Sequence, residues 1–463
     1  MNKTILAVLA LAVSAAVSAK DFNEKKVVVN LAVISDTHVN GYNTVPAYKF
    51  RSALIQERDM AARFGGLDGV VVVGDLVDSP AWDFRKYTEI NDWKRLYESV
   101  FDPGQMPLAY TIGNHDVWKE WTENTYKEAK QFNRRFGEKY YTHEVGDPEM
   151  AEKFECRHNV VGGYHILALT PNGRGPVVYP EESIKWLDEN LKALTEAEPD
   201  KYVIVITHAM IYNTVYGSLL DDTDEKHPDY WSTKVLTGVL DKYPQAVVFG
   251  GHLHFPLNDP RSVWQGGFTS MGTASTRYMA IDNGNYDSMA GRTIMKDCNE
   301  YSEGLLLQFD NKGNMRAIRM DFYNHDTIGE PWTFRRPAKD GSHLEKYSHA
   351  RRRAANKAPV MKELSVTGGE NKLTAHWAAA SDDEFAHTYF LTVKKDGKVV
   401  ASRKILADFY HEPRPSQMKK TWMREVKLEP GKYEVSVYAA DSWGAESNVL
   451  SQTCFVSEQV KDI

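Results

Sequence analysis

The sequence predicts a layered α/β domain followed by a smaller all-β sandwich domain, and three observations support this fold class. Apolar runs of strand length alternate with segments of helical periodicity up to about residue 334. These runs are continuous, as in strands that are covered on both faces. From residue 359 to the end the pattern changes to short strands of alternating polarity, which is typical of a β-sandwich of about 100 residues.

The strands and helices of the α/β part can be located from their patterns. Strands are predicted at "KVVVNLAVIS", "GVVVVG", "PLAYTIG", "GYHILALT", "KYVIVIT" and "AVVFGG". Helical spacing of apolar residues occurs in the segments 50–64, 90–100 and 184–194, and Pro180 suits the first turn of the last one. The runs "EGLLLQFD" and "NMRAIRMDF", with Gly313 between them, predict an antiparallel hairpin that closes the domain.

The chain changes character after the α/β part. Residues 335–358 are basic and compatible with helix, and we interpret them as a linker or short helix with a solvated face. In residues 359–463 the turn "KKDGKV" indicates a hairpin. The stretches "KLTAHWAAASDD" and "PGKYEVSVYAADSWGAES" resemble a fibronectin type III or immunoglobulin-like module. This resemblance implies a spacer or adhesive unit that contacts carbohydrate or protein.

The N-terminal segment has the pattern of a secretory signal peptide. Lys3 precedes an apolar run over 5–13, and small residues at 17–19 predict cleavage after Ala19, so that residues 1–19 are removed. An uncleaved membrane anchor is the alternative, but the run is shorter than the ~20 residues that a bilayer span needs. We therefore expect export to the periplasm or the exterior, without stable membrane insertion.

Composition narrows the classes of partner and of metal ligand. The formal net charge of -7 gives no support for a nucleic-acid partner, and a nuclease would need a basic groove. Cys156, Cys298 and Cys454 are the only cysteines, which excludes a disulfide-rich scaffold and makes thiolate an improbable metal ligand. A bridge between Cys156 and Cys298 and unpaired thiols both remain open at this point.

Polar side chains that can bind metal ions follow five of the predicted strands, often with glycine beside them. They are Asp36, His38, Asp75, Asp78, Asn114, His115, Asp116, His208, His252 and His254. One such aspartate is commonly a turn or helix cap, and one such histidine commonly completes a hydrogen bond. Such residues at five strand ends together indicate a shared binding site, because the ligand crevice of an α/β sheet lies beyond the carboxyl ends of its strands.

The ordered blocks "DTH", "GDLVD", "GNHD", "THA" and "GGHLH" resemble the calcineurin-like metallophosphoesterase family from about Val27 to Phe322. The family resemblance implies a four-layer α/β/β/α sandwich, which we assign to residues 27–334, with more mixed strand pairing than a parallel α/β sheet. It also implies a centre of two divalent metal ions and hydrolysis of phosphoester bonds.

The resemblance also assigns roles to individual residues. Asp36, His38 and His254 would hold the first ion, Asp75 would bridge both ions, and Asn114, His208 and His252 would hold the second. An anionic bridge offsets the repulsion between two cations. On this interpretation His252 and His254 occupy alternate positions of an extended segment and serve different ions, while Leu253 points away.

The implied mechanism is in-line attack on phosphorus by a hydroxide that bridges the ions. His115, oriented by Asp116, would protonate the leaving oxygen or neutralise charge, although a purely hydrogen-bonded His115 stays open. Asp78 would hold a ligand histidine in its required tautomer. Purple acid phosphatases have tyrosine at the position of Asp78, so no iron–phenolate centre is expected. Nitrogen and oxygen ligands suit manganese, iron or zinc.

The substrate is predicted less sharply than the chemistry. A small phosphodiester is slightly favoured over a phosphomonoester, and a non-catalytic binding or adhesion protein on this scaffold is the alternative from another class. Arg174 and Arg277 are candidate substrate-binding residues because a guanidinium forms a fork of donors toward phosphate. Other residues that could line the pocket are Tyr42, Trp82, Asn172, Tyr212 and Tyr278.

Overall fold

A computed structural model describes most of the chain. The described residues are 22–78, 84–117, 124–140, 143–172, 177–219, 232–282, 292–295 and 297–458. The predicted signal peptide, Trp82 and Arg174 lie outside these ranges.

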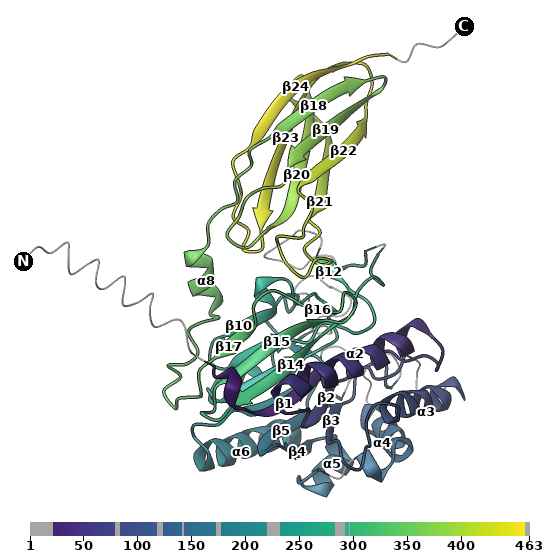
Figure 1. Cartoon of the computed structure of the whole chain (residues 1–463), viewed down its shortest axis with the longest axis vertical. Coiled ribbons are helices and arrows are strands. Elements are labelled where there is room, and N and C mark those ends of the chain that lie inside the picture. Colours follow the sequence, from purple (N-terminus) through teal and green to yellow (C-terminus); the bar gives the residue numbers. More distant parts are fainter. Residues whose placement is uncertain are drawn as a thin grey trace, which may run out of the picture.

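The first sheet of the N-terminal part is mixed and has seven strands (Figure 1). Its strands β1, β2 and β3 are parallel neighbours, β14 runs antiparallel to β1, and β15 forms the predicted hairpin with β14. The strands are β1 (Val27–Ile34), β2 (Gly69–Val73), β3 (Leu108–Thr111), β14 (Glu303–Asp310), β15 (Met315–Asp321), β16 (Asp326–Thr327) and β17 (Trp332–Phe334). Gly313 in the hairpin turn has φ +78°, a conformation that glycine adopts at no steric cost.

The second sheet has six strands in the order β10-β11-β9-β6-β5-β4. Its four central strands are parallel, whereas the edge strands β4 and β10 are antiparallel to their neighbours. The strands are β4 (Arg157–Val161), β5 (Tyr164–Leu169), β6 (Val203–Thr207), β9 (Ala246–Gly250), β10 (Val263–Gln265) and β11 (Thr269–Gly272). The apolar runs therefore predicted the strands correctly, and the mixed strand pairing that the family resemblance implied is confirmed by the antiparallel pairs at β14, β15, β4 and β10.

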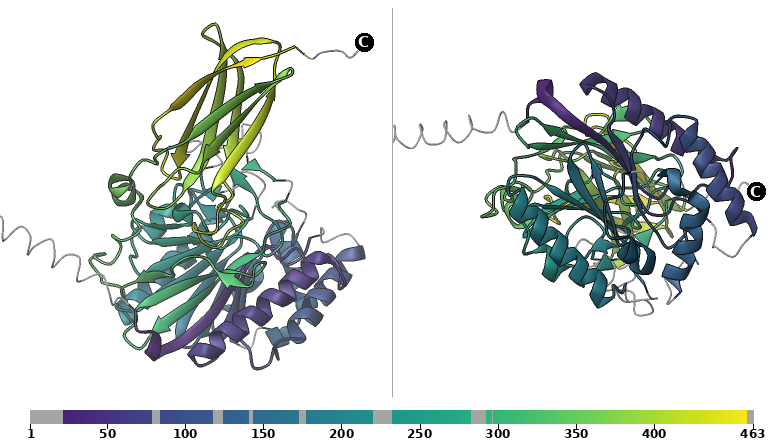
Figure 2. Two further views of the ribbon diagram at one scale, coloured as in Figure 1. Left: turned by 45° about the horizontal axis from the view of Figure 1, so that its top comes forward. Right: turned by 90° about the horizontal axis from the view of Figure 1, so that it is seen from below.

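Helices cover the outer faces of the two sheets, as Figure 2 shows. They are α2 (Val45–Ala61), α3 (Phe84–Glu98), α4 (Thr125–Phe136), α5 (Pro148–Phe154), α6 (Glu181–Ala197) and α7 (Thr237–Leu240). The Thr44 hydroxyl caps α2 by accepting a hydrogen bond from the amide of Ala47. Pro180 occupies the N-cap position of α6.

Alternate residues of each central strand point into different cores. Leu31 and Val33 of β1 pack with Ile204 and Ile206 of β6 between the two sheets. Their neighbours in β1 and β2 face Phe50 of α2 and Trp93 of α3, both of which are fully buried. Because each sheet buries both faces, the arrangement is the four-layer α/β/β/α sandwich.

Short elements complete this part of the chain. The short strands are β7 (Met210–Ile211), β8 (Ser232–Thr233), β12 (Ile281–Asp282) and β13 (Arg292–Thr293). The 3₁₀ turns are η1 (Glu24–Lys26), η2 (Ala62–Phe64), η3 (Glu138–Tyr140) and η5 (Pro260–Ser262). The basic segment predicted as a linker or short helix contains α8 (His349–Ala355). None of the helices within the described ranges combines the length and apolar character that a bilayer span requires.

The C-terminal part is an all-β sandwich of a three-stranded and a four-stranded sheet (Figure 1). Its strands are β18 (Leu364–Gly369), β19 (Lys372–Ala378), β20 (Ala386–Lys395), β21 (Lys398–Leu406), β22 (Thr421–Lys427), β23 (Gly431–Asp441) and β24 (Leu450–Val456). The predicted hairpin joins β20 and β21, and Asp396 and Gly397 have φ of 50° and 76°. Two successive positive φ values give the turn a twist that matches the flanking strands.

The sandwich docks on the α/β part through a buried polar cluster. The Arg261 guanidinium donates to both oxygens of Asp259, each at 2.8 Å. His387 of β20 is fully buried, and its Nε2 lies 3.1 Å from the Tyr216 hydroxyl and 3.7 Å from Asp259 Oδ2. A buried charge pair depends on such partners, so this contact orders the two parts relative to each other.

All three cysteines lie in the described part of the chain, and none of them forms a disulfide. This structure therefore resolves the open alternative in favour of unpaired thiols at Cys156 and Cys298.

Candidate metal centre

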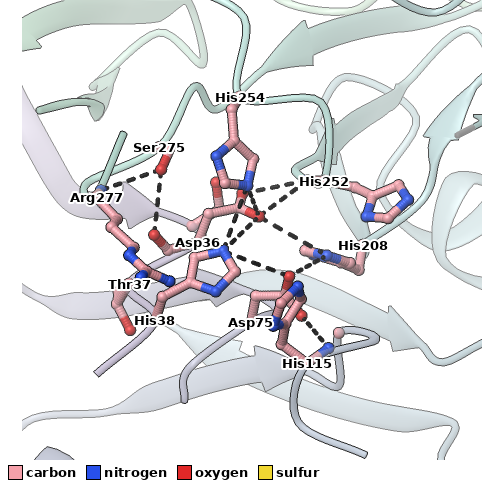
Figure 3. Close-up of polar contacts among 12 residues, drawn as sticks. Asp36, Thr37, His38, Asp75, His115, His208, His252, His254, Ser275 and Arg277 are labelled. Carbon is pink, nitrogen blue, oxygen red and sulfur yellow. Dashed lines mark hydrogen bonds and ion pairs between the residues drawn. The ribbon is translucent and has the colours of Figure 1, made fainter. Parts of the chain in front are cut away.

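The carboxyl ends of strands from both sheets meet at one edge of the sandwich. Asp36 and His38 follow β1, Asp75 follows β2, Asn114 and His115 follow β3, His208 follows β6, and His252 and His254 follow β9. In Figure 3 Asp36, Asp75 and the histidines His38, His208 and His254 turn toward one another. The fold thus brings the predicted ligands together from distant parts of the chain.

One group of candidate ligands consists of Asp36, His38 and His254. His254 Nε2 lies 2.9 Å from Asp36 Oδ1 and 3.3 Å from His38 Nε2. The three ligand atoms lie within 4.8 Å of one another, and all three residues are buried. This is the set that the family resemblance assigns to the first ion.

A second group consists of Asp75, His208 and His252, again buried and within 4.8 Å. Asp75 Oδ2 lies 3.2 Å from His208 Nε2 and 3.6 Å from His38 Nε2, so this carboxylate stands between the two groups. Asn114 is also buried. The amide of the next residue, His115, donates to Asp75 Oδ1 at 2.7 Å, so the chain passes this carboxylate directly after Asn114.

The outer nitrogen of three of these imidazoles faces an acceptor. Nδ1 of His208 lies 2.7 Å from the Val73 carbonyl, and Nδ1 of His254 lies 3.0 Å from the Tyr278 carbonyl. A carbonyl oxygen only accepts, so each Nδ1 carries a hydrogen, and Nε2 is the nitrogen of each ring that a metal ion would bind. His38 Nδ1 similarly lies 3.3 Å from Asp78 Oδ1. This arrangement is typical of metal-binding histidines.

The backbone at the centre is strained in a consistent way. Five candidate ligands have left-handed φ values, namely Asp36 (52°), His38 (43°), Asp75 (52°), His252 (68°) and His254 (61°). Non-glycine residues rarely adopt this conformation, which costs of order 1–3 kcal/mol per residue. Such a concentration of strain indicates a functional site that the surrounding sheets hold in place.

The positive φ values correct one detail of the sequence interpretation. His252 and His254 do not lie on an extended segment, because both residues are left-handed. The two side chains nevertheless join different ligand groups, and the intervening Leu253 is buried in the core between the sheets. Two left-handed residues, rather than an extended strand, thus direct His252 and His254 to different ligand groups.

Glycine lets strands approach the ligands closely. A Cβ at Gly74 would lie 2.3 Å from His208 Nδ1, and one at Gly251 would lie 2.6 Å from Asp36 Oδ2. Real Cβ atoms do not approach other heavy atoms so closely. Side chains at these positions would therefore displace a candidate ligand.

The charges of the centre favour a cation. Burial acts to raise the pKa of Asp36, but the charges of His254 and His208 outweigh it and lower this pKa to about 2. Burial acts to lower the pKa of His208, whereas Asp75 and Asp36 raise it to about 9. The two buried carboxylates stay ionised and draw positive charge toward them, which is the electrostatic requirement of a cation site.

His115 is oriented differently from what the sequence predicted. Its Nδ1 lies 3.1 Å from the Asp78 carbonyl and 3.4 Å from Asp78 Oδ1. Asp116 instead accepts hydrogen bonds from the amides of Val77 (3.0 Å) and Gly113 (2.9 Å). The expected orientation of His115 by Asp116 was therefore wrong, because the Asp116 carboxylate is used to hold the β2 and β3 loops together.

Among the candidate substrate-binding residues, Arg277 reaches the centre. Its Nη1 lies 2.6 Å from Asp78 Oδ1, and the neighbouring Tyr278 ring lies 4.3 Å from the His254 ring. Tyr42 instead packs against Arg95 of α3, at 4.1 Å from the guanidinium carbon to the ring centroid. Tyr212 packs similarly against Lys234, at 4.0 Å, and the Asn172 amide donates to the Val178 carbonyl.

Sequence reasoning missed Ser275, which supports the centre from a sixth strand. The Ser275 hydroxyl donates to the Asp36 carbonyl at 3.2 Å and accepts from the amide of Arg277 at 3.0 Å. The signal was present, because "MGTASTRY" follows the end of a strand that pairs with β9. It was overlooked because serine and threonine are weaker metal-site indicators than aspartate and histidine.

Comparison with known proteins agrees with this geometry. Residues 29–256 match the model of the calcineurin-like phosphoesterase family. The chain contains a calcineurin-like phosphoesterase domain. The matched residues include every candidate ligand from Asp36 to His254. No curated protein sequence matches the chain.

Solved structures similar to this chain are distant in sequence. Purple acid phosphatase PPD1 from seeds of yellow lupin (Lupinus luteus) has 13% identity and a TM-score of 0.47, and the alignment covers 71% of this chain and 57% of that one. FN3tt has 16% identity and a TM-score of 0.16, with 22% and 99% covered. The fibronectin(III)-like modules of Clostridium thermocellum CbhA have 21% identity and a TM-score of 0.14, with 22% and 96% covered.

Proposed function

We propose that this calcineurin-like phosphoesterase is an exported, metal-dependent hydrolase that uses two divalent ions and prefers small phosphodiesters. The observation that carries the proposal is the pair of buried ligand groups on either side of Asp75. Export is supported by the signal-peptide pattern, and cleavage after Ala19 would leave Lys20 as the first residue of the purified mature chain.

The residues present fit such a centre. Asp36, His38 and His254 would hold one ion, Asn114, His208 and His252 would hold the other, and Asp75 would contact both. Imidazole, carboxylate and amide oxygen together suit manganese, iron or zinc. When bound, such ions supply positive charge toward a phosphoryl group and make water more acidic.

His115 is the group best placed to move a proton. Burial acts to lower the pKa of His115, but Asp75 and the hydrogen bond with Asp78 outweigh burial and raise it. Because Nδ1 faces Asp78, Nε2 is the ring nitrogen that would hold a proton toward the leaving oxygen. Positive charge at this position also stabilises a transition state that accumulates negative charge.

The charge balance around the centre supports a diester. Within the described ranges, Arg277 is the arginine that contacts the residues of the centre, and Asp78 already pairs with it. A phosphodiester carries one negative charge, whereas a monoester carries close to two at neutral pH and benefits from further cationic donors. A phosphomonoesterase and a non-catalytic binding protein are the competing proposals.

Metal analysis combined with two substrates tests the proposal. We expect the purified full chain to bind two divalent ions and to hydrolyse bis-p-nitrophenyl phosphate with a higher kcat/KM than p-nitrophenyl phosphate. A higher value for the monoester would establish a phosphatase instead. Two bound ions without hydrolysis of either ester would favour a binding protein, and a single ion at saturation would contradict the two-ion centre.

Replacing His115 with alanine is expected to lower kcat by about 10²-fold, a typical contribution of general acid catalysis, while both ions stay bound. The measurements are steady-state kinetics and the metal content of the variant. His158→Ala is the matched control, because His158 is a half-buried histidine of β4 whose ring contacts His165 rather than the centre. Loss of metal in His115→Ala would instead make His115 a ligand.

A further inference from the structure

The backbone of Arg277 is held to helix α2 by a single lysine. Lys49 Nζ donates to the carbonyl oxygens of Arg277 (2.6 Å), Asn299 (2.5 Å) and Tyr301 (2.6 Å). An ammonium group has three N–H donors, so these bonds use all of them. Lys49 is half-buried, and burial lowers its pKa to about 8.

The loop that carries Arg277, residues 274–280, is anchored to the metal centre at its two ends. The amide of Thr276 donates to the Ser35 carbonyl at 3.2 Å, and the amide of Ala280 donates to the His254 carbonyl at 3.0 Å. Between these anchors the carbonyl of Arg277 faces Lys49. The lysine therefore acts on the middle of the loop, where the backbone position decides how far the Arg277 side chain reaches.

Lys49 also joins this loop to a second segment, residues 297–301. The Met279 amide donates to the Cys298 carbonyl at 3.0 Å, which places the segment alongside the loop. The carbonyls of Arg277, Asn299 and Tyr301 all direct their negative ends at one point. The hydrogen bonds to Arg277 and Tyr301 are partly buried, and the one to Asn299 is exposed. Without a cation there, the three acceptors would repel one another, and the two partly buried ones would lose their partner.

We propose that Lys49 is a positioning residue for substrate, which holds Arg277 where its guanidinium can bind the phosphoryl group. The inference rests on the proposed function and extends it to a residue outside the family motifs. Asp78 orients the tip of the Arg277 side chain at 2.6 Å, Ser275 binds the Arg277 amide, and Lys49 binds its carbonyl. When substrate binds, the guanidinium has further N–H groups available beside the one directed at Asp78.

A double-mutant cycle tests whether Lys49 acts through Arg277. The variants are Lys49→Met, Arg277→Ala and the double variant, with KM for bis-p-nitrophenyl phosphate and Kd for inorganic phosphate by calorimetry as readouts. We expect Lys49→Met to raise both constants about tenfold with metal content unchanged, and to change them less than about twofold when Arg277 is already alanine. An equal effect in both backgrounds would show a purely structural lysine and overturn the proposal.

Two further variants keep the test decisive. Lys94→Met is the matched control, since Lys94 on α3 donates to the Arg135 carbonyl at 2.9 Å, and its loss should leave KM and Kd unchanged. Lys49→Arg retains charged donors and should recover much of the loss. If Lys49→Met does not fold, Lys49→Gln replaces it in the cycle, because its amide still donates two hydrogen bonds.

The two readouts separate this inference from the proposed function. If the wild-type chain hydrolyses neither ester but phosphate binding shows the expected coupling, the proposed hydrolysis fails and the role of Lys49 stands. If the wild type hydrolyses the diester and the two substitutions are additive in both KM and Kd, the role of Lys49 fails and the proposed hydrolysis stands.

Discussion

Replacing Asp75 with asparagine is expected to remove nearly all hydrolysis and to lower the bound metal below two ions per chain. The Asp75 carboxylate lies between the two ligand groups, with Oδ2 3.2 Å from His208 Nε2 and 3.6 Å from His38 Nε2. An asparagine amide has one oxygen and no charge, so it cannot offset the repulsion between two cations. If this costs about 4 kcal/mol in the transition state, kcat/KM falls about 10³-fold.

The measurements for Asp75→Asn are kcat/KM on the diester and metal content after saturation and desalting. Asp321→Asn is the matched control, because Asp321 is a buried aspartate of β15 that accepts hydrogen bonds from Asn324 outside the centre. Full turnover with two ions retained in Asp75→Asn would show that the carboxylate is not shared, and the proposed centre would have to be abandoned.

The second large effect is expected from Gly113→Ala. A Cβ at position 113 would lie 2.1 Å from Asp75 Oδ1 and 2.3 Å from the backbone nitrogen of Asp75. A flexible side chain could move away, but a backbone atom on a strand end cannot do so without shifting β2 against β3. Because Asn114 and His115 follow directly, we expect a loss of hydrolysis of at least about 10²-fold and a lower melting temperature.

Gly238→Ala is the matched control for this substitution. A Cβ at Gly238 meets no atom within 4 Å, and the residue lies in helix α7, where alanine is favoured by roughly 0.5–1 kcal/mol. We expect this variant to keep its activity and to melt at the same or a higher temperature. Wild-type activity in Gly113→Ala would mean that the close approach to Asp75 is not needed for function.

The C-terminal sandwich contacts a segment, residues 297–301, that is joined through Lys49 to the loop beside the metal centre. His411 Nε2 of the sandwich lies 2.7 Å from Asp297 Oδ2, and Asp297 begins the segment whose carbonyls Lys49 binds. The buried cluster of Asp259, Arg261 and His387 adds a second contact between the two parts. The likeness to a spacer module therefore predicted the fold of this part but not its attachment to the loops of the phosphoesterase domain.

The sequence predicted the strands well, and it predicted that the candidate ligands gather at one edge, for a physical reason. A strand buried on both faces must be continuously apolar, so a polar group directly after "LAVIS" or "VVFGG" stands out. Their shared position at strand ends then indicated a common edge, and Asp36, Asp75 and His254 do lie together there. The signal-peptide, domain-boundary and substrate predictions remain predictions.

The prediction for His115 was wrong because residues distant in the sequence form the hydrogen bonds that had been expected between neighbours. Asp116 was expected to orient His115 because the two are adjacent in the chain, yet the amides of Val77 and Gly113 take its oxygens. The ring of His115 instead contacts Asp78, which lies 37 residues before His115 in the chain. Adjacency in sequence says little about side-chain direction when the backbone turns sharply between two residues.

The sequence by itself determined the apolar strands, the residues with metal-binding chemistry and their order along the chain, since burial and ligand type are properties of single residues and short segments. Only the tertiary structure decided which histidines lie beside Asp75, which carboxylate faces His115 and which lysine holds Arg277. Those choices depend on hydrogen bonds between residues far apart in the chain, 228 positions apart for Lys49 and Arg277 and 252 for Lys49 and Tyr301, and such partners are selected by the packing of whole sheets.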